Sequence, residues 1–428
     1  MAIQNSIENL MHKLYPIHRS QTGDGVRQTL EMLSDFGLAI RTIEVPSGEK
    51  VFDWEVPPEW QINDAFIKDA DGNRLVDYND SNLHVLNGST GIEKRMALAD
   101  LEPYLHVGGP DTIPYRTAFF ADKWGFCLSQ NQYDQMQQGR EPFHVCIDAK
   151  RFDGSLTIGE AELKGESDEV VIIWTHTCHP SLANDNVSGI AAAAGLYRKL
   201  EMSRRKFTYR FVFAPATIGA ITWLAKNENS LGQIKFGLVL CLLGDERGFT
   251  FKTTRRTDHL IDRCLQLIAS THLQPIDVIP FSPIGYDERQ FCSPGIDLPF
   301  ARISRATENG YPEYHSSGDS LSLISENRIM ESVDMVYSVL KTAEDNCLPI
   351  NTSPKCEPRL GSAGLFARHG EERANSASQR SILWTLNLSD GQHDALAISE
   401  RSGIPFEEIA QAIFVLADHG FLEVKEAI

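Results

Sequence analysis

The sequence predicts an α/β protein whose mixed, mostly parallel sheet is covered by helices on both faces. Three nearly continuous apolar runs alternate with helix-like runs, and they read EVVIIWTH, YRFVFAPA and FGLVLCLLG. Apolar strands separated by helices are typical of such a sheet, because both of its faces are buried. A block of short β-like pieces at residues 45–116 adds an inserted β-rich lid domain. Three helical runs and a final strand add a C-terminal winged-helix domain.

The first elements along the chain are helical. Residues 3–15 and 25–36 carry apolar side chains at three- and four-residue spacing, which predicts two amphipathic helices. Short β-like pieces follow, and Asp71-Gly72-Asn73 lies between two of them as a hairpin turn. Farther along, EPFHVCIDAK and SLTIGEAEL predict a second hairpin that leads into the apolar strands.

These patterns divide the chain into a catalytic domain and three further parts. We expect the catalytic domain at residues 1–44 and 117–350, with the inserted domain at 45–116 between its segments. Residues 351–377 are rich in Ser, Pro, Glu, Arg and Gly and predict a linker. Residues 378–428 predict the winged helix, because the helical runs SILWTLNL, HDALAISERSG and PFEEIAQAIFVLADHG precede the strand-like FLEVKE.

Composition limits the class of protein. The chain has 428 residues, of which 42% are hydrophobic and 23% charged, and this suits a globular protein with a sizeable core. No stretch approaches the ~20 apolar residues that span a bilayer. The N-terminus lacks a signal-peptide pattern, so we expect a cytoplasmic protein with no membrane partner. None of the eight cysteines forms a CxxC pair, which favours packed, reduced thiols.

Charge argues against nucleic acid as a partner, despite the winged helix. The formal net charge of the chain is -18. From residue 380 to 428, three basic residues oppose eight acidic ones, giving 3 - 8 = -5. The would-be recognition helix opens with Pro405-Phe406-Glu407-Glu408, and phosphates would repel its two carboxylates. We therefore expect this domain to pack against the protein or to contact another protein chain, including a second copy in a homo-oligomer.

A candidate metal site follows the first apolar strand. His176 ends that run, His179 follows three residues later, and Asp185 lies in the next loop. Functional groups gather beyond the C-terminal ends of such strands, and imidazole and carboxylate are the usual ligands of a hydrolytic zinc ion. Hydrogen-bonded structural histidines are the alternative. Cys178 is either a further ligand or, as we prefer, a packed thiol.

This stretch resembles the zinc aminopeptidases of the co-catalytic type and their relatives, the single-zinc glutaminyl cyclases. The resemblance rests on a strand that ends in His, followed by Asn-Asp-Asn-x-Ser-Gly at the start of a small-residue helix. It implies that Asp185 is a metal ligand. A later Tyr-His-Ser-Ser-Gly-Asp segment, residues 314–319, implies His315 as another ligand. Between them, residues 286–291 resemble the family's Ser-Asp-His-x-x-Phe segment. The matches span roughly residues 165–345.

The whole chain resembles a branch of bacterial aminopeptidase-like proteins that carry an inserted β-domain and a C-terminal winged helix. Three short stretches support this resemblance: Trp124-Gly125-Phe126-Cys127, Cys178-His179-Pro180 and Asp287-Glu288-Arg289-Gln290.

Two departures from the family pattern point to one zinc ion instead of two. The family has an adjacent Glu pair after the next strand, but residues 214–219 contain no carboxylate. Cys241 occupies the place of an Asp ligand. We therefore expect a single zinc held by Asp185, His315 and one strand-end histidine. His179 ranks slightly ahead because Pro180 restricts its backbone next to the Asp-bearing loop, although His176 matches the family position better.

A hydrolase also needs a general base to replace the missing Glu. Glu288, Glu246 and Glu313 are the candidates, and the alternative for each is a solvated loop acid or an arginine partner. For substrate binding the candidates are Arg255, Tyr314 and Asp287. Arg255 could bind a substrate carboxylate through two hydrogen bonds, or it could belong to an exposed basic pair.

The sequence thus predicts a metal-dependent hydrolase of aminopeptidase type, in which a single zinc-activated water attacks a small peptide or amino-acid conjugate. The inserted domain would narrow access to the site. The alternative is a catalytically silent scaffold of the same fold that binds a small ligand or a protein partner, and the absent Glu pair favours it. Acyl transfer or cyclisation at one zinc is also chemically allowed.

Overall fold

The computed structural model describes residues 6–307, 310–363, 365 and 378–426. The chain forms two compact units. The first contains Met1–Thr257 and Ile276–Val336, and the second contains Asp258–Pro275 and Tyr337–Ile428. Among the described residues, no helix combines the length and the apolar character needed to cross a bilayer. All eight cysteines are free thiols.

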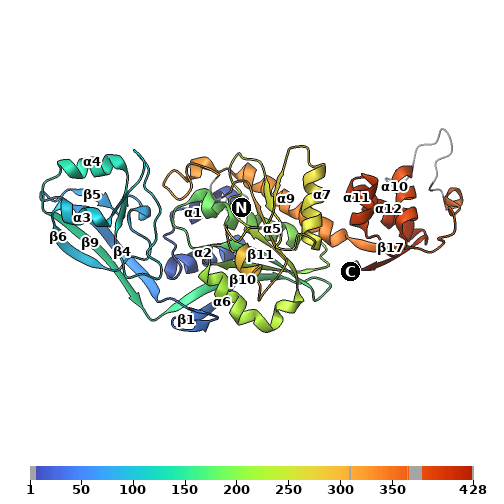
Figure 1. Cartoon of the computed structure of the whole chain (residues 1–428), viewed down its shortest axis with the longest axis horizontal. Helices are drawn as coiled ribbons and strands as arrows, with labels where there is room; N and C mark the ends of the chain where they lie inside the picture. The colour runs from blue at the N-terminus through green and yellow to red at the C-terminus, as the bar shows by residue number, and fades with distance from the viewer. Residues whose placement is uncertain (1–5, 308–309, 364, 366–377, 427–428) are drawn as a thin grey trace. The chain divides into compact units, whose positions relative to one another are not determined.

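The first unit is built on an eight-stranded sheet (Figure 1). In order across the sheet, its strands are β1 (Arg41–Pro46), β10 (Ser155–Leu163), β12 (Thr208–Ala214), β11 (Val170–His176), β13 (Ile234–Leu240), β16 (Phe300–Ser304), β14 (Thr250–Lys252) and β15 (Asp277–Ile279). The four central strands, from β12 to β16, are parallel. Strand β10 pairs antiparallel with β1 and β12, and β14 pairs antiparallel with β16 but parallel with β15. The predicted mixed, mostly parallel sheet is confirmed.

Both faces of strand β11 are buried, which explains its continuous apolar sequence. On one face, the Trp174 ring lies 6.0 Å from Trp223 of α6 (Ile218–Asn227) and 4.9 Å from Phe291 of α8 (Glu288–Phe291). On the other face lies α5 (Gly189–Glu201), whose small residues allow close packing. At its first residue, Gly189, a Cβ atom would lie 2.7 Å from the carbonyl oxygen of Leu240. Glycine therefore lets α5 begin directly beside β13.

Further helices cover the first unit, and the two predicted N-terminal helices are present. They are α1 (Ile7–Leu14) and α2 (Asp24–Phe36). Helix α1 contacts α5, and α2 contacts β10. Helix α9 (Glu326–Asp345) connects the first unit to the second along the chain.

A second sheet in the first unit has the order β5 (Arg74–Asp77), β4 (Glu59–Lys68), β9 (Phe143–Phe152) and β6 (Ile92–Met96). The predicted turn at Asp71-Gly72-Asn73 joins β4 to β5. Smaller elements complete this region: β2 (Lys50–Val51), β3 (Trp54–Glu55), α3 (Leu98–Leu101), β7 (Leu105–Val107), β8 (Phe126–Leu128) and α4 (Gln130–Gln138). The sheet has its own core, which includes Ile67, Met136 and Phe143.

The expected boundaries of the inserted domain at 45–116 differ from the structure. Strand β9, beyond residue 116, pairs with β4 and β6, and residues 45–46 belong to β1 of the central sheet. The predicted hairpin of EPFHVCIDAK and SLTIGEAEL is also wrong. In the described ranges, β9 forms no ladder with β10, which pairs with β1 and β12. Both strands alternate apolar and polar residues, and this pattern does not identify a strand's partner.

The second unit contains the winged helix, with α7 (Leu260–Thr271) and the end of α9. Its other elements are β17 (Cys347–Asn351), α10 (Gln379–Leu388), α11 (Ala395–Ser402), α12 (Phe406–Asp418) and β18 (Leu422–Glu426). Strand β17 pairs with β18, so this fold begins before the expected linker at 351–377. Residues 364 and 366–377 of that linker lie outside the described residues. Helix α7 was expected in the catalytic domain, but it clusters with this unit.

The pKa of His18, a histidine of the first unit, makes the stability of the protein depend on pH. Its Nδ1 atom lies 2.6 Å from the Tyr78 hydroxyl, and its ring lies 5.3 Å from that of Trp60. Burial, with a smaller contribution from Arg19, lowers the pKa of His18 to about 3. An unfolded chain binds this proton near pH 6.5, so the stability contribution is complete above that pH and decreases as the pH falls toward 3.

Replacing His18 by glutamine should therefore flatten the pH dependence of stability. Between about pH 7 and pH 5, the wild type should lose about 2 kcal/mol more unfolding free energy than His18→Gln, since each pH unit below 6.5 costs about 1.4 kcal/mol. Urea unfolding at the two pH values measures this difference. The exposed His12→Gln variant is the control, and equal slopes for all three proteins would show that His18 takes up its proton in the folded state.

Candidate metal centre

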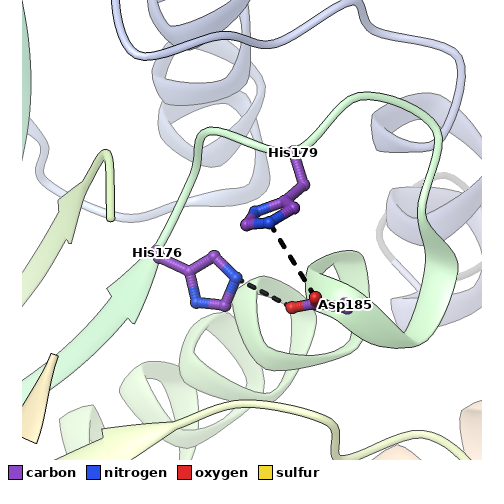
Figure 2. Close-up of side chains that lie close together, drawn as sticks. All are labelled: His176, His179 and Asp185. Carbon is purple, nitrogen blue, oxygen red and sulfur yellow. Dashed lines mark hydrogen bonds and ion pairs between the residues drawn. The ribbon is translucent and has the colours of Figure 1, made fainter. Parts of the chain in front are cut away.

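The C-terminal end of β11 brings two histidines to one carboxylate. His176 ends the strand, His179 follows in the loop, and Asp185 lies in the irregular turn Ala183–Ser188 that leads into α5. Figure 2 shows both imidazole rings directed at the Asp185 carboxylate. The His176 Nε2 atom lies 2.9 Å from Oδ1, and the His179 Nε2 atom lies 3.9 Å from Oδ2. His176 and Asp185 are 1% and 0% exposed.

A third imidazole reaches the same carboxylate from the loop before α9. The His315 Nε2 atom lies 3.1 Å from Asp185 Oδ2. The Tyr314 ring stacks on His315 with a centroid distance of 3.9 Å. His315 has a positive φ of 54°, a left-handed backbone conformation that is uncommon for a residue with a side chain. Asp185 thus lies among three histidines from two distant segments of the chain.

Neighbouring polar groups fix the backbone around Asp185. The Asp319 carboxylate accepts hydrogen bonds from the backbone N–H groups of Asn184 and Asp185, at 2.6 and 2.9 Å. Burial raises the pKa of Asp319 to about 7. The Asn186 side chain donates to Thr175 Oγ1 at 2.8 Å, which ties the turn to β11. Asp319 and Asn186 therefore hold the turn that carries the Asp185 carboxylate, a role that the sequence did not reveal.

The electrostatics of the cluster suit metal ligation. Burial lowers the pKa of His179 to about 3, so its imidazole is neutral near pH 7. Burial raises the pKa of Asp185, but His179 and the hydrogen bonds of His176 and His315 outweigh it and hold that pKa well below its usual range. A neutral imidazole and an ionised carboxylate are the protonation states in which these side chains bind metal.

The donor spacing also fits a divalent cation. Zinc–ligand bonds of ~2.0–2.1 Å place neighbouring ligand atoms of a tetrahedral site about 3.3 Å apart. The nitrogen–oxygen distances around Asp185 are 2.9, 3.1 and 3.9 Å. The donor atoms of His176, His179 and Asp185 all lie within 4.8 Å of one another. Asp185 and two of the three imidazoles could hold one ion.

Cys178 does not join this donor set. Its Sγ atom accepts a hydrogen bond from the backbone N–H of Ala216 at 3.2 Å. Burial raises the pKa of this thiol to about 12, so it is not a thiolate near pH 7. The packing of the thiol against the loop after β12 explains its presence without a metal.

Of the three candidate bases, two lie in ion pairs that fit poorly with catalysis. Glu288 is fully buried, and its Oε1 atom lies 2.8 Å from Lys252 Nζ and 3.6 Å from Arg302 Nη1. Glu246 is exposed and pairs with Arg328. Glu313 lies on the loop of His315, and its Oε2 atom is 3.8 Å from Arg247 Nη2.

The candidate substrate-binding residues also separate. Arg255 lies 3.6 Å from Asp297 in a partly exposed ion pair. Asp287 is buried, and its two oxygens accept hydrogen bonds from Trp174 Nε1 at 2.8 Å and from the Thr217 backbone N–H at 3.0 Å. Burial raises the pKa of Asp287. Both oxygens of Asp287 are thus engaged in hydrogen bonds within the fold, and a contact between Asp287 and substrate stays a prediction. Only Tyr314 contacts the cluster, through His315.

Sequence reasoning missed Tyr115 and Arg19, which both contact the cluster. Tyr115 is the last residue but one of the predicted inserted domain, residues 45–116. Its ring lies 5.1 Å from that of His179 and 5.2 Å from that of His315. Arg19 follows α1, and its Nε donates to the His179 carbonyl oxygen at 2.8 Å. Neither residue lies in a recognisable motif, so only the fold shows their proximity.

The fold and the cluster together define an aminopeptidase-like protein with a C-terminal winged helix. The chain belongs to the family described as "Domain of unknown function (DUF4910)", whose sequence profile matches residues 8–346. A winged helix-turn-helix profile matches residues 348–424. The resemblance to aminopeptidases and the C-terminal winged helix expected from the sequence are confirmed.

Similar proteins agree with this assignment. A Clostridium acetobutylicum protein described as a "Putative polysaccharide biosynthesis protein with aminopeptidase-like domain" is 40% identical over 418 residues, 96% of this chain and 95% of that one. A crystal structure of a "putative peptidase" from Clostridium acetobutylicum has a TM-score of 0.92 at 39% identity and covers 98% of this chain and 96% of its own. A zinc aminopeptidase from Bacillus subtilis has a TM-score of 0.56 at 12% identity, covering 79% and 95%, and shares the fold.

Proposed function

We propose that this protein is a metal-dependent hydrolase of aminopeptidase type that acts on a small peptide or an amino-acid conjugate. The observation that carries the proposal is the buried Asp185 carboxylate among three imidazoles at the C-terminal edge of a parallel sheet. A buried ionised group needs compensation, and a bound cation with an open ligand position would give this arrangement a chemical purpose.

In this proposal Asp185, His315 and either His179 or His176 hold one zinc ion. When bound, zinc would polarise a carbonyl oxygen and lower the pKa of a water ligand to about 7. Tyr115 and Tyr314 contact the histidines and would limit the access of solvent to the site. Glu313 is the candidate that remains for moving a proton, because it lies two residues before His315 and its Oε2 atom accepts no hydrogen bond from the described residues.

A second candidate function is a scaffold of the same fold that binds a ligand without hydrolysing it. Strand β12 ends at Ala214, just before the position where the resembled family has an adjacent Glu pair. In this chain the backbone N–H of Ala216 at that position donates a hydrogen bond to the Cys178 thiol. The Clostridium acetobutylicum relative is described in terms of polysaccharide biosynthesis. An amino-sugar amide is therefore a ligand or substrate class to include beside peptides.

We also propose that the winged helix contacts protein and not nucleic acid. Helix α12 has Glu407 and Glu408 in its first turn, and Phe414 of the same helix is exposed. Negative charge at that helix start repels phosphates, whereas an exposed aromatic ring favours a protein surface, including that of a second copy.

An activity screen tests the proposed hydrolase. Zinc-loaded full-length protein should hydrolyse at least one substrate among aminoacyl amides, dipeptides and amino-sugar amides. Glu313→Gln should then lower kcat by about 10²- to 10⁴-fold with an unchanged zinc content, because a general base contributes that much. Glu246→Gln, whose carboxylate pairs with Arg328 on the surface, is the control and should keep its activity. No turnover by zinc-loaded protein would favour the binding scaffold.

A further inference from the structure

Beside the candidate metal centre, Arg19 is buried and forms no ion pair with a carboxylate of the described residues. The Arg19 residue is 1% exposed. The Nε atom donates to the His179 carbonyl oxygen at 2.8 Å, and Nη1 donates to the Leu14 carbonyl oxygen at 2.7 Å. In the part of the chain that the structure describes, Nη2 is buried and has no hydrogen-bond partner. A buried cation in this state is costly unless another group compensates it.

Tyr115 presents a second donor without a partner near the same place. The residue is 3% exposed, and its hydroxyl finds no hydrogen-bond partner among the described residues. Its backbone N–H donates to the His315 carbonyl oxygen at 2.7 Å, so the ring is held against the histidines. Arg19 and Tyr115 both contact His179, Arg19 through the His179 carbonyl oxygen at 2.8 Å and Tyr115 through the imidazole ring at 5.1 Å.

We propose that Arg19 and Tyr115 form a binding site for the carboxylate group of a ligand, next to His179. The guanidinium Nη2 and the phenol hydroxyl can each donate a hydrogen bond. A carboxylate offers two acceptor oxygens for them, and its negative charge would compensate the positive charge of Arg19. A phosphate group would bring more oxygens and more charge than two donors satisfy. Both donors lie on segments that contact the histidines, so the bound carboxylate would lie beside the candidate metal centre.

That the bound carboxylate belongs to a substrate rests on the proposed function. That Arg19 and Tyr115 bind an anion does not depend on it. If the chain is a hydrolase, its substrate is a peptide or amino-acid conjugate with a free carboxylate, and the amidated analogue is a poorer substrate. Because acetate binding is measured on zinc-free protein, a failure of catalysis and a failure of this site give separate results.

The test measures anion binding with acetate as the probe. Full-length protein is stripped of metal with a chelator, and thermal unfolding is followed in sodium acetate, sodium phosphate and sodium chloride at equal ionic strength. Acetate should raise the unfolding midpoint of the wild type more than the other two salts, because binding to the folded state stabilises it. Tyr115→Phe removes only the hydroxyl and should weaken the apparent affinity for acetate about tenfold.

Tyr115→Phe should keep the unfolding midpoint of the probe-free protein or raise it, since the lost hydroxyl has no partner. The matched control is Tyr197→Phe, which removes another buried phenol hydroxyl, on α5, and should bind acetate like the wild type. Three outcomes would overturn the proposal: no stabilisation by acetate, equal stabilisation by all three salts, or equal affinity of the wild type and Tyr115→Phe. Stronger stabilisation by phosphate would identify a phosphate site instead.

Discussion

Replacing Asp185 by asparagine should abolish the binding of zinc, of which the wild type should hold about one ion per chain. The Asp185 carboxylate lies against His176, His179 and His315 together. Asparagine has nearly the same shape but lacks the charge, and an amide is a far weaker zinc ligand than a carboxylate. Elemental mass spectrometry on protein purified without chelator or an affinity-tag metal gives the zinc content directly.

The control for this experiment is Asp35→Asn, which changes an exposed carboxylate on α2 and should leave the zinc content unchanged. Two ions per wild-type chain would show that further residues act as ligands. Zinc that persists in Asp185→Asn would place the ion elsewhere. A wild type that binds no metal even after zinc is added would contradict the hydrolase proposal and leave the binding scaffold.

Lys252→Met should destabilise the first unit by about 3–5 kcal/mol, the usual cost of breaking a buried ion pair from one side. Lys252 and Glu288 are 2% and 0% exposed, with 2.8 Å between Lys252 Nζ and Glu288 Oε1. The lysine also donates to the Ile284 carbonyl oxygen at 2.6 Å. Without Lys252, the buried Glu288 carboxylate depends on Arg302 at 3.6 Å. Urea unfolding measures the loss.

Lys226→Met provides the matched control, because Lys226 pairs with Glu49 at a similar 2.9 Å but on the surface. That variant should lose less than about 1 kcal/mol. Glu288→Gln should follow Lys252→Met and lower stability, since the structure makes Glu288 a partner in the ion pair. If Glu288→Gln kept full stability and lost only activity, Glu288 would be a catalytic base after all.

The site residues that could be predicted from the sequence are close together in the chain or belong to a short motif. A strand end followed by a polar loop placed His176, His179 and Asp185 together, because the chain has little room to separate them over ten residues. His315 lies 130 residues beyond Asp185, and only its resemblance to a family motif connected it to the site. The central parallel strands were predictable for a similar reason, since their apolar runs are continuous.

The other features depend on which distant segments meet. Nothing near Arg19 or Tyr115 in the sequence shows that both contact His179. The role of Glu288 was missed because its partner, Lys252, lies 36 residues earlier in a strand that no motif marks. A carboxylate in a family-like segment was therefore interpreted as catalytic, whereas the structure buries it in an ion pair with Lys252.

The pairing of β1 with β10 shows where residues could be removed from the chain without breaking the central sheet. In that ladder Pro46 lies opposite Ser155, so the chain leaves the central sheet at one point and returns at the neighbouring one. Excision of residues 47–154 and closure by a tight turn would convert β1 and β10 into a simple hairpin. Cutting at residues 45–116 would instead leave β9 with neither of its partner strands and create an exposed edge prone to aggregation. The shortened chain would keep every histidine around Asp185, but it would lack Tyr115.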